Sequence, residues 1–192
     1  MIMRPNVRKF ALAAHLTFSV GWIGAVVAYL ALGVAAAITE DARRLGAAWM
    51  AMDLSGWYVI VPLAAASWLT GLVMALGTKW GLFRHYWVLF SFVLTSLAAV
   101  VLILHMPEVS TLANAARGAE GAGLQGLDKH LYAQLGRGDL LHPGLGLVVL
   151  LVIQVLNVYK PSGMTRYGWR KQGERRDPLR GSRDAQERVL QS

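Results

Sequence analysis

The sequence predicts an all-α protein, a four-helix transmembrane bundle whose helices run up, down, up and down. First, 55% of the 192 residues are hydrophobic and the mean hydropathy is positive. Second, four long stretches contain no Asp, Glu, Lys or Arg, and each offers the roughly 20 residues that a helix needs to cross a membrane. Third, the connections are too short for a soluble domain. The predicted spans are about residues 10–38, 54–78, 86–107 and 140–159.

The distribution of basic residues predicts the orientation of the bundle. If both termini and the second connection share one side, that side carries 14 of the 19 Lys and Arg residues, against five on the other side. Lys and Arg accumulate in the cytoplasmic segments of membrane proteins. We therefore expect a multi-pass protein of the cell membrane with its N-terminus and its C-terminus in the cytoplasm.

The first predicted span combines small residues with a bulky apolar face. Gly21 with Ala25, and Gly24 with Ala28, stand four residues apart, a spacing that lets another helix approach closely in lipid. The opposite face carries Leu, Val and Tyr29 and suits contact with acyl chains. The uncharged run has 29 residues, well beyond the apolar core of a signal peptide, so we expect it to remain as an anchor.

The second predicted span contains Pro62, which predicts a kink near residues 59–63 because proline lacks a backbone donor. Residues 47–53 are able to extend this helix outward, which would bring Asp53 near the outer interface. The span also carries a second series of small residues, Ser67, Gly71 and Ala75.

The last two predicted spans are joined by a long outer connection, residues 108–139, rich in Gly, Ala and charge. Within it, residues 112–116 are able to prolong the third helix, and residues 127–135 to form a short interfacial helix. Connections of this length are usually functional or disordered. We expect residues 1–160 to form the bundle and residues 161–192 to form a basic, disordered cytoplasmic tail.

The net charge of +8 points to lipid as the partner of the basic segments. They flank apolar spans, so we expect them to meet the bilayer, with the tail on anionic lipid headgroups, and we expect no nucleic acid. The small-residue faces also allow a homo-oligomer. The chain has no cysteine, which excludes disulfides, thiolate metal sites, iron–sulfur clusters and cysteine nucleophiles.

Four of the five histidines lie near the ends of predicted spans. His15 and His85 fall toward the cytoplasmic face, and His105 and His142 fall toward the outer face. Two imidazoles on facing helices are able to supply the axial nitrogens of haem b. Trp22 lies two turns after His15, where it would wall a porphyrin pocket. These residues are candidate haem ligands and contacts, although water or headgroups also satisfy a histidine at a membrane boundary.

A second interpretation is a metal site at the outer face. Two pairs of an imidazole and a carboxylate stand three residues apart at the mouths of neighbouring spans: His105 with Glu108, and Asp139 with His142. Each pair shares one helical face, provided that Pro107 does not break the first helix. With Asp53 near, these ligands suit zinc, copper or iron.

Other function classes find little support in the sequence. It shows no Ser-His-Asp order, no phosphate-cradling glycine loop and no dinucleotide fingerprint. The first two spans do not resemble the last two, as they would in many secondary transporters. A cofactor-free structural or interaction protein remains an alternative, and it predicts that the histidines are dispensable.

Several segments resemble an uncharacterised family of small bacterial four-span integral membrane proteins. They are Val61-Pro62-Leu63, residues 69–72, residues 77–89 (Gly-Thr-Lys-Trp-Gly-Leu-Phe-Arg-His-Tyr-Trp-Val-Leu), His142-Pro143-Gly144 and residues 158–161. The likeness covers about residues 10–170 and implies a protein of the bacterial inner membrane. It implies no particular activity.

A more distant resemblance lies in the first span. His15 followed by Trp22 and Gly24 is similar to the first helix of the CopD copper-resistance domain and of the HemJ-type protoporphyrinogen oxidases. The latter likeness implies haem binding and porphyrinogen oxidation, with His15 as the matching position. The sequence thus predicts a membrane protein that binds haem b through its histidines, for electron transfer or porphyrin-related redox chemistry. A copper- or zinc-binding protein and a cofactor-free interaction protein are the alternatives.

Overall fold

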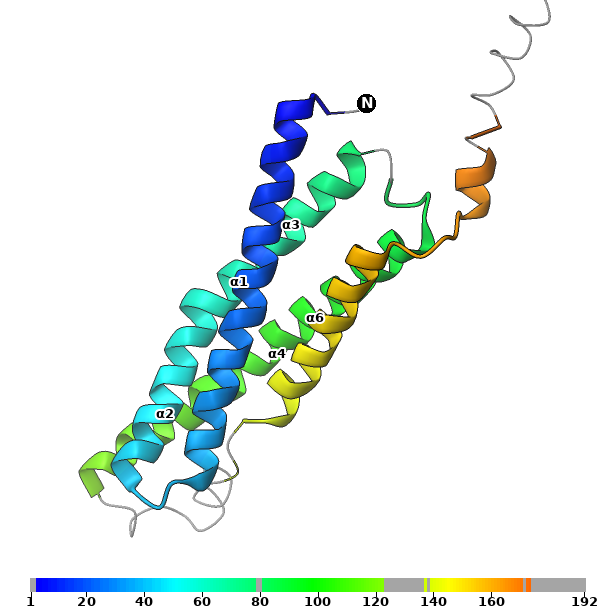
Figure 1. The fold of residues 1–192 in the computed structure, drawn as a ribbon. Helices are drawn as coiled ribbons and strands as arrows, with labels where there is room; N and C mark the ends of the chain where they lie inside the picture. Colours follow the sequence, from blue (N-terminus) through cyan, green and yellow to red (C-terminus); the bar gives the residue numbers. More distant parts are fainter. Residues whose placement is uncertain (1–2, 79–80, 123–136, 138, 171, 174–192) are drawn as a thin grey trace, which may run out of the picture.

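The computed structural model describes residues 3–78, 81–122, 137, 139–170 and 172–173. Within these residues the chain is mostly helical, with no strand and one isolated bridge. The elements are α1 (Pro5–Ile38), α2 (Ala42–Ser55), the π-helical turn η1 (Gly56–Ile60), α3 (Val61–Gly77), α4 (Tyr86–Ala122) and α6 (Leu141–Tyr159) (Figure 1). Because α2, η1 and α3 follow one another without a break, they form a single rod, and the predicted all-α four-helix bundle is confirmed.

The four rods pack as a closed bundle. α1 contacts α2 and α3 on one side and α6 on another, and α4 likewise contacts α2, α3 and α6. The chain direction alternates from rod to rod, so the start of α1 and the end of α6 lie at the same end of the molecule, the upper end in Figure 1. This is the predicted up-down-up-down arrangement.

The surface of the bundle is suited to lipid. Four described helices are long and apolar enough to cross a membrane, namely Pro5–Ile38, Arg43–Gly77, Tyr86–Gly118 and Leu141–Tyr159. Many large apolar side chains are exposed on their outer faces, among them Phe10, Leu104 and Val158. Soluble proteins do not expose apolar surface on this scale. The protein is therefore a multi-pass membrane protein, while its orientation stays a prediction.

α2 begins well before the predicted boundary at residue 54. The side chain of Asp41 accepts a hydrogen bond from the backbone N–H of Arg43 and caps the helix. Four buried residues then recur at the spacing i, i+3, i+4 and i+7, which forms an apolar stripe along one face; they are Leu45, Ala48, Trp49 and Met52. This stripe, rather than uniform hydrophobicity, makes the segment helical.

α4 continues past the predicted end at residue 107. Pro107 lies inside the helix without ending it, although proline removes one helical hydrogen bond. The helix persists because the next turns pack against α2, where Met106, Val109 and Ala113 are buried. Packing of an apolar face is able to hold a helix together across such a defect.

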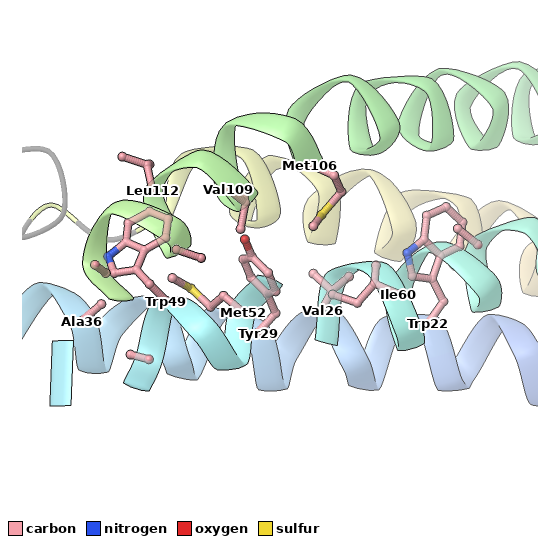
Figure 2. Close-up of a cluster of buried hydrophobic side chains, with 14 of the residues drawn as sticks. Trp22, Val26, Tyr29, Ala36, Trp49, Met52, Ile60, Met106, Val109 and Leu112 are labelled. Atoms are coloured by element: carbon pink, nitrogen blue, oxygen red, sulfur yellow. The ribbon is translucent and has the colours of Figure 1, made fainter. Parts of the chain in front are cut away.

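The long helices project beyond α6 at one end of the bundle. α6 has 19 residues, about 28 Å, and α4 has 37, about 55 Å. The two are level at the other end, because the backbone N–H of Tyr86 donates to the carbonyl of Gly163. We call the projecting part, residues 34–55 and 106–118, the three-helix extension. Figure 2 shows Trp49, Met52 and Leu112 within its core.

The predicted irregularity near Pro62 takes the form of a π-helical turn. η1 covers Gly56–Ile60 and ends just before the proline. In a regular helix the ring of Pro62 would clash with the carbonyl of Tyr58 four residues earlier. A π turn widens the helix at that point and relieves the clash, and such turns often accompany functional sites.

The chain directly after α6 is held against the connection between α3 and α4. Lys160 adopts a left-handed conformation that ends α6. Met164 then forms the isolated bridge with His85, and the backbone N–H of Thr165 donates to the carbonyl of Arg84. The first part of the predicted tail is therefore ordered by hydrogen bonds. The predicted interfacial helix at residues 127–135 and the tail from residue 174 lie outside the described residues.

Candidate metal centre

Three of the predicted ligands meet where α6 begins. His105 comes from the middle of α4, Asp139 lies just before α6, and His142 lies in the first turn of α6. One ligand atom from each of them lies within 4.8 Å of the others. The two i, i+3 pairs read from the sequence thus converge on one site, and Pro107 does not prevent it.

The two imidazole rings lie face to face. Their centroids are 3.9 Å apart and their planes are inclined by 20°. The Nε2 atom of His105 lies 2.8 Å from Oδ2 of Asp139, which is hydrogen-bond distance. The Nδ1 atom of His142 lies 4.0 Å from Oδ1 of the same carboxylate. The carboxylate of Asp139 therefore lies near one ring nitrogen of each histidine and is hydrogen-bonded to that of His105.

Two further side chains orient these groups. Nδ1 of His105 lies 3.5 Å from Oε2 of Glu108, one turn along the same helix. The hydroxyl of Tyr29 on α1 donates to Oδ2 of Asp139 at 2.7 Å. In metal sites a ligating histidine commonly donates its other N–H to a carboxylate, and a ligating carboxylate accepts a hydrogen bond of its own. Glu108 and Tyr29 occupy those two supporting positions.

The close approach of α1 to the site depends on Gly33. A side-chain carbon at this position would lie 2.5 Å from the backbone oxygen of Asp139 and 3.1 Å from a methyl of Leu140. Only glycine leaves room for the segment that carries Asp139. The absence of a side chain here brings the carboxylate within reach of Tyr29, one turn earlier on α1.

The charge of Asp139 is stabilised in spite of its burial. Its side chain is 7% exposed. Burial raises the pKa of Asp139, but the hydrogen bonds from His105 and Tyr29, together with the charge of the two histidines, have the larger combined effect and lower it below 3.8. The carboxyl group is therefore an anion at neutral pH and able to ligate a cation.

The ligand set has one open side. The side chain of His142 is 48% exposed, whereas His105 and Asp139 are largely enclosed. Two imidazole nitrogens and one carboxylate oxygen are typical ligands of zinc, copper and non-haem iron, at about 2.0–2.2 Å for zinc. The 2.8 Å hydrogen bond between His105 and Asp139 already brings two of the candidate ligand atoms together.

An apolar pocket of about 250 Å³ adjoins the candidate metal centre. α1, η1, α4 and α6 all contribute to its wall, and the three ligands lie at one end of it. The predicted haem contact Trp22 lines this pocket, and it is buried in the apolar cluster that Figure 2 shows. The structure thus associates Trp22 with the pocket of His105 and His142.

His15 has a different environment. Its Nδ1 lies 3.1 Å from the hydroxyl oxygen of Thr70 on α3, and its ring packs on Gly71, where a side-chain carbon would be 3.1 Å away. One turn further along, the hydroxyls of Ser19 and Ser67 lie 2.8 Å apart. His15 is therefore part of a polar contact between α1 and α3.

His85 lies at the end of the connection between α3 and α4. Its backbone pairs with Met164, and its ring centroid is 6.5 Å from that of Trp87. It lines a second pocket together with Lys160 and Trp169 at the end of the molecule that holds the termini. The predicted pairing of His85 with His15 around a haem stays a prediction.

Asp53 belongs to a separate chain of hydrogen bonds between α2 and α4. Its Oδ1 accepts a 2.6 Å hydrogen bond from Ser110, whose oxygen in turn accepts one from the indole N–H of Trp57 at 2.9 Å. The carboxylate that sequence reasoning placed near the metal therefore ties the three-helix extension together.

Sequence reasoning assigned Tyr29 to the lipid-facing side of the first span, and this assignment is wrong. Tyr29 is buried, and its hydroxyl bonds to Asp139. The available signal was the cost of leaving a phenolic hydroxyl unpaired at membrane depth, which predicts a polar partner. Gly33 was missed too, because nothing in the sequence distinguishes it from the other small residues of the span.

The stacked rings bear on the haem prediction. If His105 and His142 were the two axial ligands of one haem, the porphyrin would have to lie between them. Rings with centroids 3.9 Å apart are already in van der Waals contact, so such binding requires them to separate.

Comparison of the chain with family models, with curated proteins and with solved structures found no match. The resemblances to the CopD domain and to the HemJ-type oxidases therefore stay predictions. The functional argument rests on the geometry of the site.

Proposed function

We propose that this multi-pass membrane protein binds one transition-metal ion, copper or zinc, at His105, Asp139 and His142. The observation that supports the proposal most is the convergence of three ligand atoms within 4.8 Å. Glu108 and Tyr29 add the outer hydrogen bonds that metal sites use to fix their ligands.

The chemistry of the site favours handling of a metal ion over a closed structural role. Structural zinc sites have four protein ligands, whereas sites that exchange or react keep a position open. Here two of the three ligands, His105 and Asp139, are largely enclosed, and the ring of the third, His142, is half-exposed. The proposed role is reversible binding of a divalent ion at the end of the bundle that faces away from the termini.

The direct test is metal binding by the full-length protein in mild detergent. Elemental analysis of the purified protein and calorimetric titration with Zn²⁺ and with Cu²⁺ should give one ion per chain. His105→Ala and Asp139→Asn each remove a ligand and should abolish this binding. Glu108→Gln removes only the supporting carboxylate and should weaken binding about 10- to 100-fold.

The matched control is His85→Ala, which removes an imidazole at the other end of the bundle. It should leave one ion bound with wild-type affinity. Equal binding by the wild type and by Asp139→Asn, in protein that keeps its helical circular dichroism, would overturn the proposal. Loss of binding in His85→Ala alone would move the site to the opposite end.

Haem b, for electron transfer or porphyrin-related redox chemistry, is a second candidate, and the apolar pocket beside His142 favours it. A single imidazole ligand and an aromatic wall such as Trp22 are common features of haem pockets. The test is a reduced-minus-oxidised absorption spectrum of protein purified from haem-replete cells. A sharp haem b signal that disappears in His142→Ala would support this candidate over the metal ion. A colourless protein would contradict it.

A further inference from the structure

The apolar pocket beside the metal centre is long and narrow. Its wall on α4 runs from Leu94 to Met106, which is about 18 Å of helix, and its wall on α6 runs from His142 to Leu150, about 12 Å. With a volume of about 250 Å³, these dimensions suit an extended hydrocarbon chain better than a broad ring system.

The pocket opens sideways toward lipid. Several of its lining residues are also on the surface of the bundle, on both helices that border it. Leu97 on α4 is 58% exposed and Leu145 on α6 is 60% exposed. In a membrane these side chains meet acyl chains. A molecule dissolved in the bilayer therefore reaches the pocket between α4 and α6 without passing through water.

The ionisable groups of the pocket lie at one end. His105, Asp139 and His142 line that end, and the rest of the wall is almost entirely apolar. Asp139 already accepts hydrogen bonds from His105 and Tyr29, whereas the half-exposed ring of His142 has a face and an edge open to a ligand. A ligand head at this end would meet an imidazole N–H donor.

The charged side chains at this end of the pocket determine which kind of ligand head group is able to bind there. An anionic head, such as that of a fatty acid, would add a third negative charge beside the carboxylates of Asp139 and Glu108, and these like charges would repel it. A neutral head that accepts hydrogen bonds avoids this repulsion. A carbonyl oxygen on a flat ring meets both requirements, because it accepts from an imidazole and stacks on one.

We propose that this pocket binds a neutral, membrane-dissolved carbonyl compound with a long apolar chain, the chemistry of an isoprenoid quinone. The head lies against the ring of His142, and the chain lies between α4 and α6. This site shares His142 with the metal site that it adjoins, but its occupant needs no metal ion.

Two glycines of α6 allow a matched test. Gly146 lines the pocket, whereas Gly144 does not, and a side-chain carbon at either position would meet no atom within 4 Å. The full-length protein in mild detergent is titrated with a benzoquinone that carries a ten-carbon chain. Quenching of tryptophan fluorescence reports binding, because Trp22 lines the pocket.

The wild type should show saturable quenching. Gly146→Leu should raise the dissociation constant about tenfold or more, because the new side chain occupies the space of the ligand chain. Gly144→Leu should stay within about twofold of the wild type, since its side chain lies outside the pocket. Circular dichroism confirms folding of each variant, and Gly146→Val replaces Gly146→Leu if the larger residue prevents folding.

Equal dissociation constants for the wild type and both leucine variants would overturn the proposal, because the quinone would then be partitioning into detergent. Decanoate, which has a similar chain and an anionic head, should bind at least tenfold more weakly than the quinone. Equal binding of the two compounds would overturn the proposed preference for a neutral head group. All titrations are repeated with a chelator present. Quinone binding that persists in the chelator does not depend on a metal ion. The quinone proposal and the metal proposal are therefore tested separately, and each is able to be refuted without the other.

Discussion

At the scale of single residues, the candidate site depends on one glycine as much as on its ligands. Gly33 lets α1 pass so close to Asp139 that even one added carbon would come within 2.5 Å of a backbone oxygen. A backbone atom in a helix start is unable to move as freely as the end of a side chain. The position of the carboxylate is therefore set by α1, although α1 supplies no ligand.

Gly33→Ala should displace Asp139 and weaken metal binding. Overpacking of this kind typically costs about 1–3 kcal/mol, and the moved carboxylate also loses its alignment with Tyr29. Calorimetric titration and thermal unfolding measure the two effects. Gly24→Ala on the same helix is the control, because a side-chain carbon there would meet no atom within 4 Å. Comparable losses in both variants would contradict a specific role for Gly33.

Asp139 also predicts how stability depends on pH. Its hydrogen bonds from His105 and Tyr29 outweigh its burial and hold its pKa below 3.8. A carboxyl group with a lowered folded pKa contributes stability that is fully present above its unfolded pKa. That contribution is lost as the pH falls through the lower, folded value.

The melting temperature of the wild type should therefore fall below about pH 4 by more than that of Asp139→Asn, which has no carboxyl group to titrate. Thermal unfolding in detergent at pH 7, 5, 4 and 3 gives the comparison. Parallel curves for the two proteins would show that Asp139 does not carry the pH dependence.

At the scale of elements, the sequence predicted the spans better than it predicted their ends. Uncharged runs locate the membrane core, because lipid excludes charge. Outside the uncharged runs, α2 carries Arg43, Arg44 and Asp53 beside its buried stripe, so uniform hydrophobicity does not mark this helix. The third uncharged run likewise ends at residue 107, before Glu108, whereas packing on α2 continues α4 beyond it.

The sequence predicted the i, i+3 spacing of the site residues, but it did not predict that the two pairs meet in space. Each i, i+3 pair is a local feature of one helix, so the sequence contains it. Whether α4 and α6 face each other at the same height depends on how the rods pack, which no local pattern encodes. The partner on α1, Tyr29, is 110 positions away from Asp139 and could be found only from the fold.

Trp49→Ala tests whether the three-helix extension is a packed unit. Trp49 is among the largest fully buried side chains, and removal of such a residue typically costs about 3–5 kcal/mol. Thermal unfolding and limited proteolysis should both show a large loss of stability. Trp169→Ala, at a position 64% exposed, should change stability by no more than about 0.5 kcal/mol. Similar small effects for both substitutions would contradict a packed extension.

At the scale of the whole molecule, the bundle has two different ends. One end holds the start of α1, the end of α6 and most of the basic residues that the structure describes, and the other holds the candidate metal centre and the three-helix extension. The difference in charge predicts that the first end is cytoplasmic. The metal centre would then face the outside of the cell membrane, which decides where its ion comes from.

The absence of cysteine makes this orientation directly measurable, because any introduced thiol is the only one in the chain. Glu40 lies exposed between α1 and α2, and Ser162 lies exposed just after α6, at the opposite end. With a membrane-impermeant maleimide, Glu40→Cys should be labelled in intact cells and Ser162→Cys should not. Both should be labelled once the membrane is permeabilised, which controls for reactivity. The reverse pattern would place the termini outside, and the metal centre would then draw its ion from the cytoplasm.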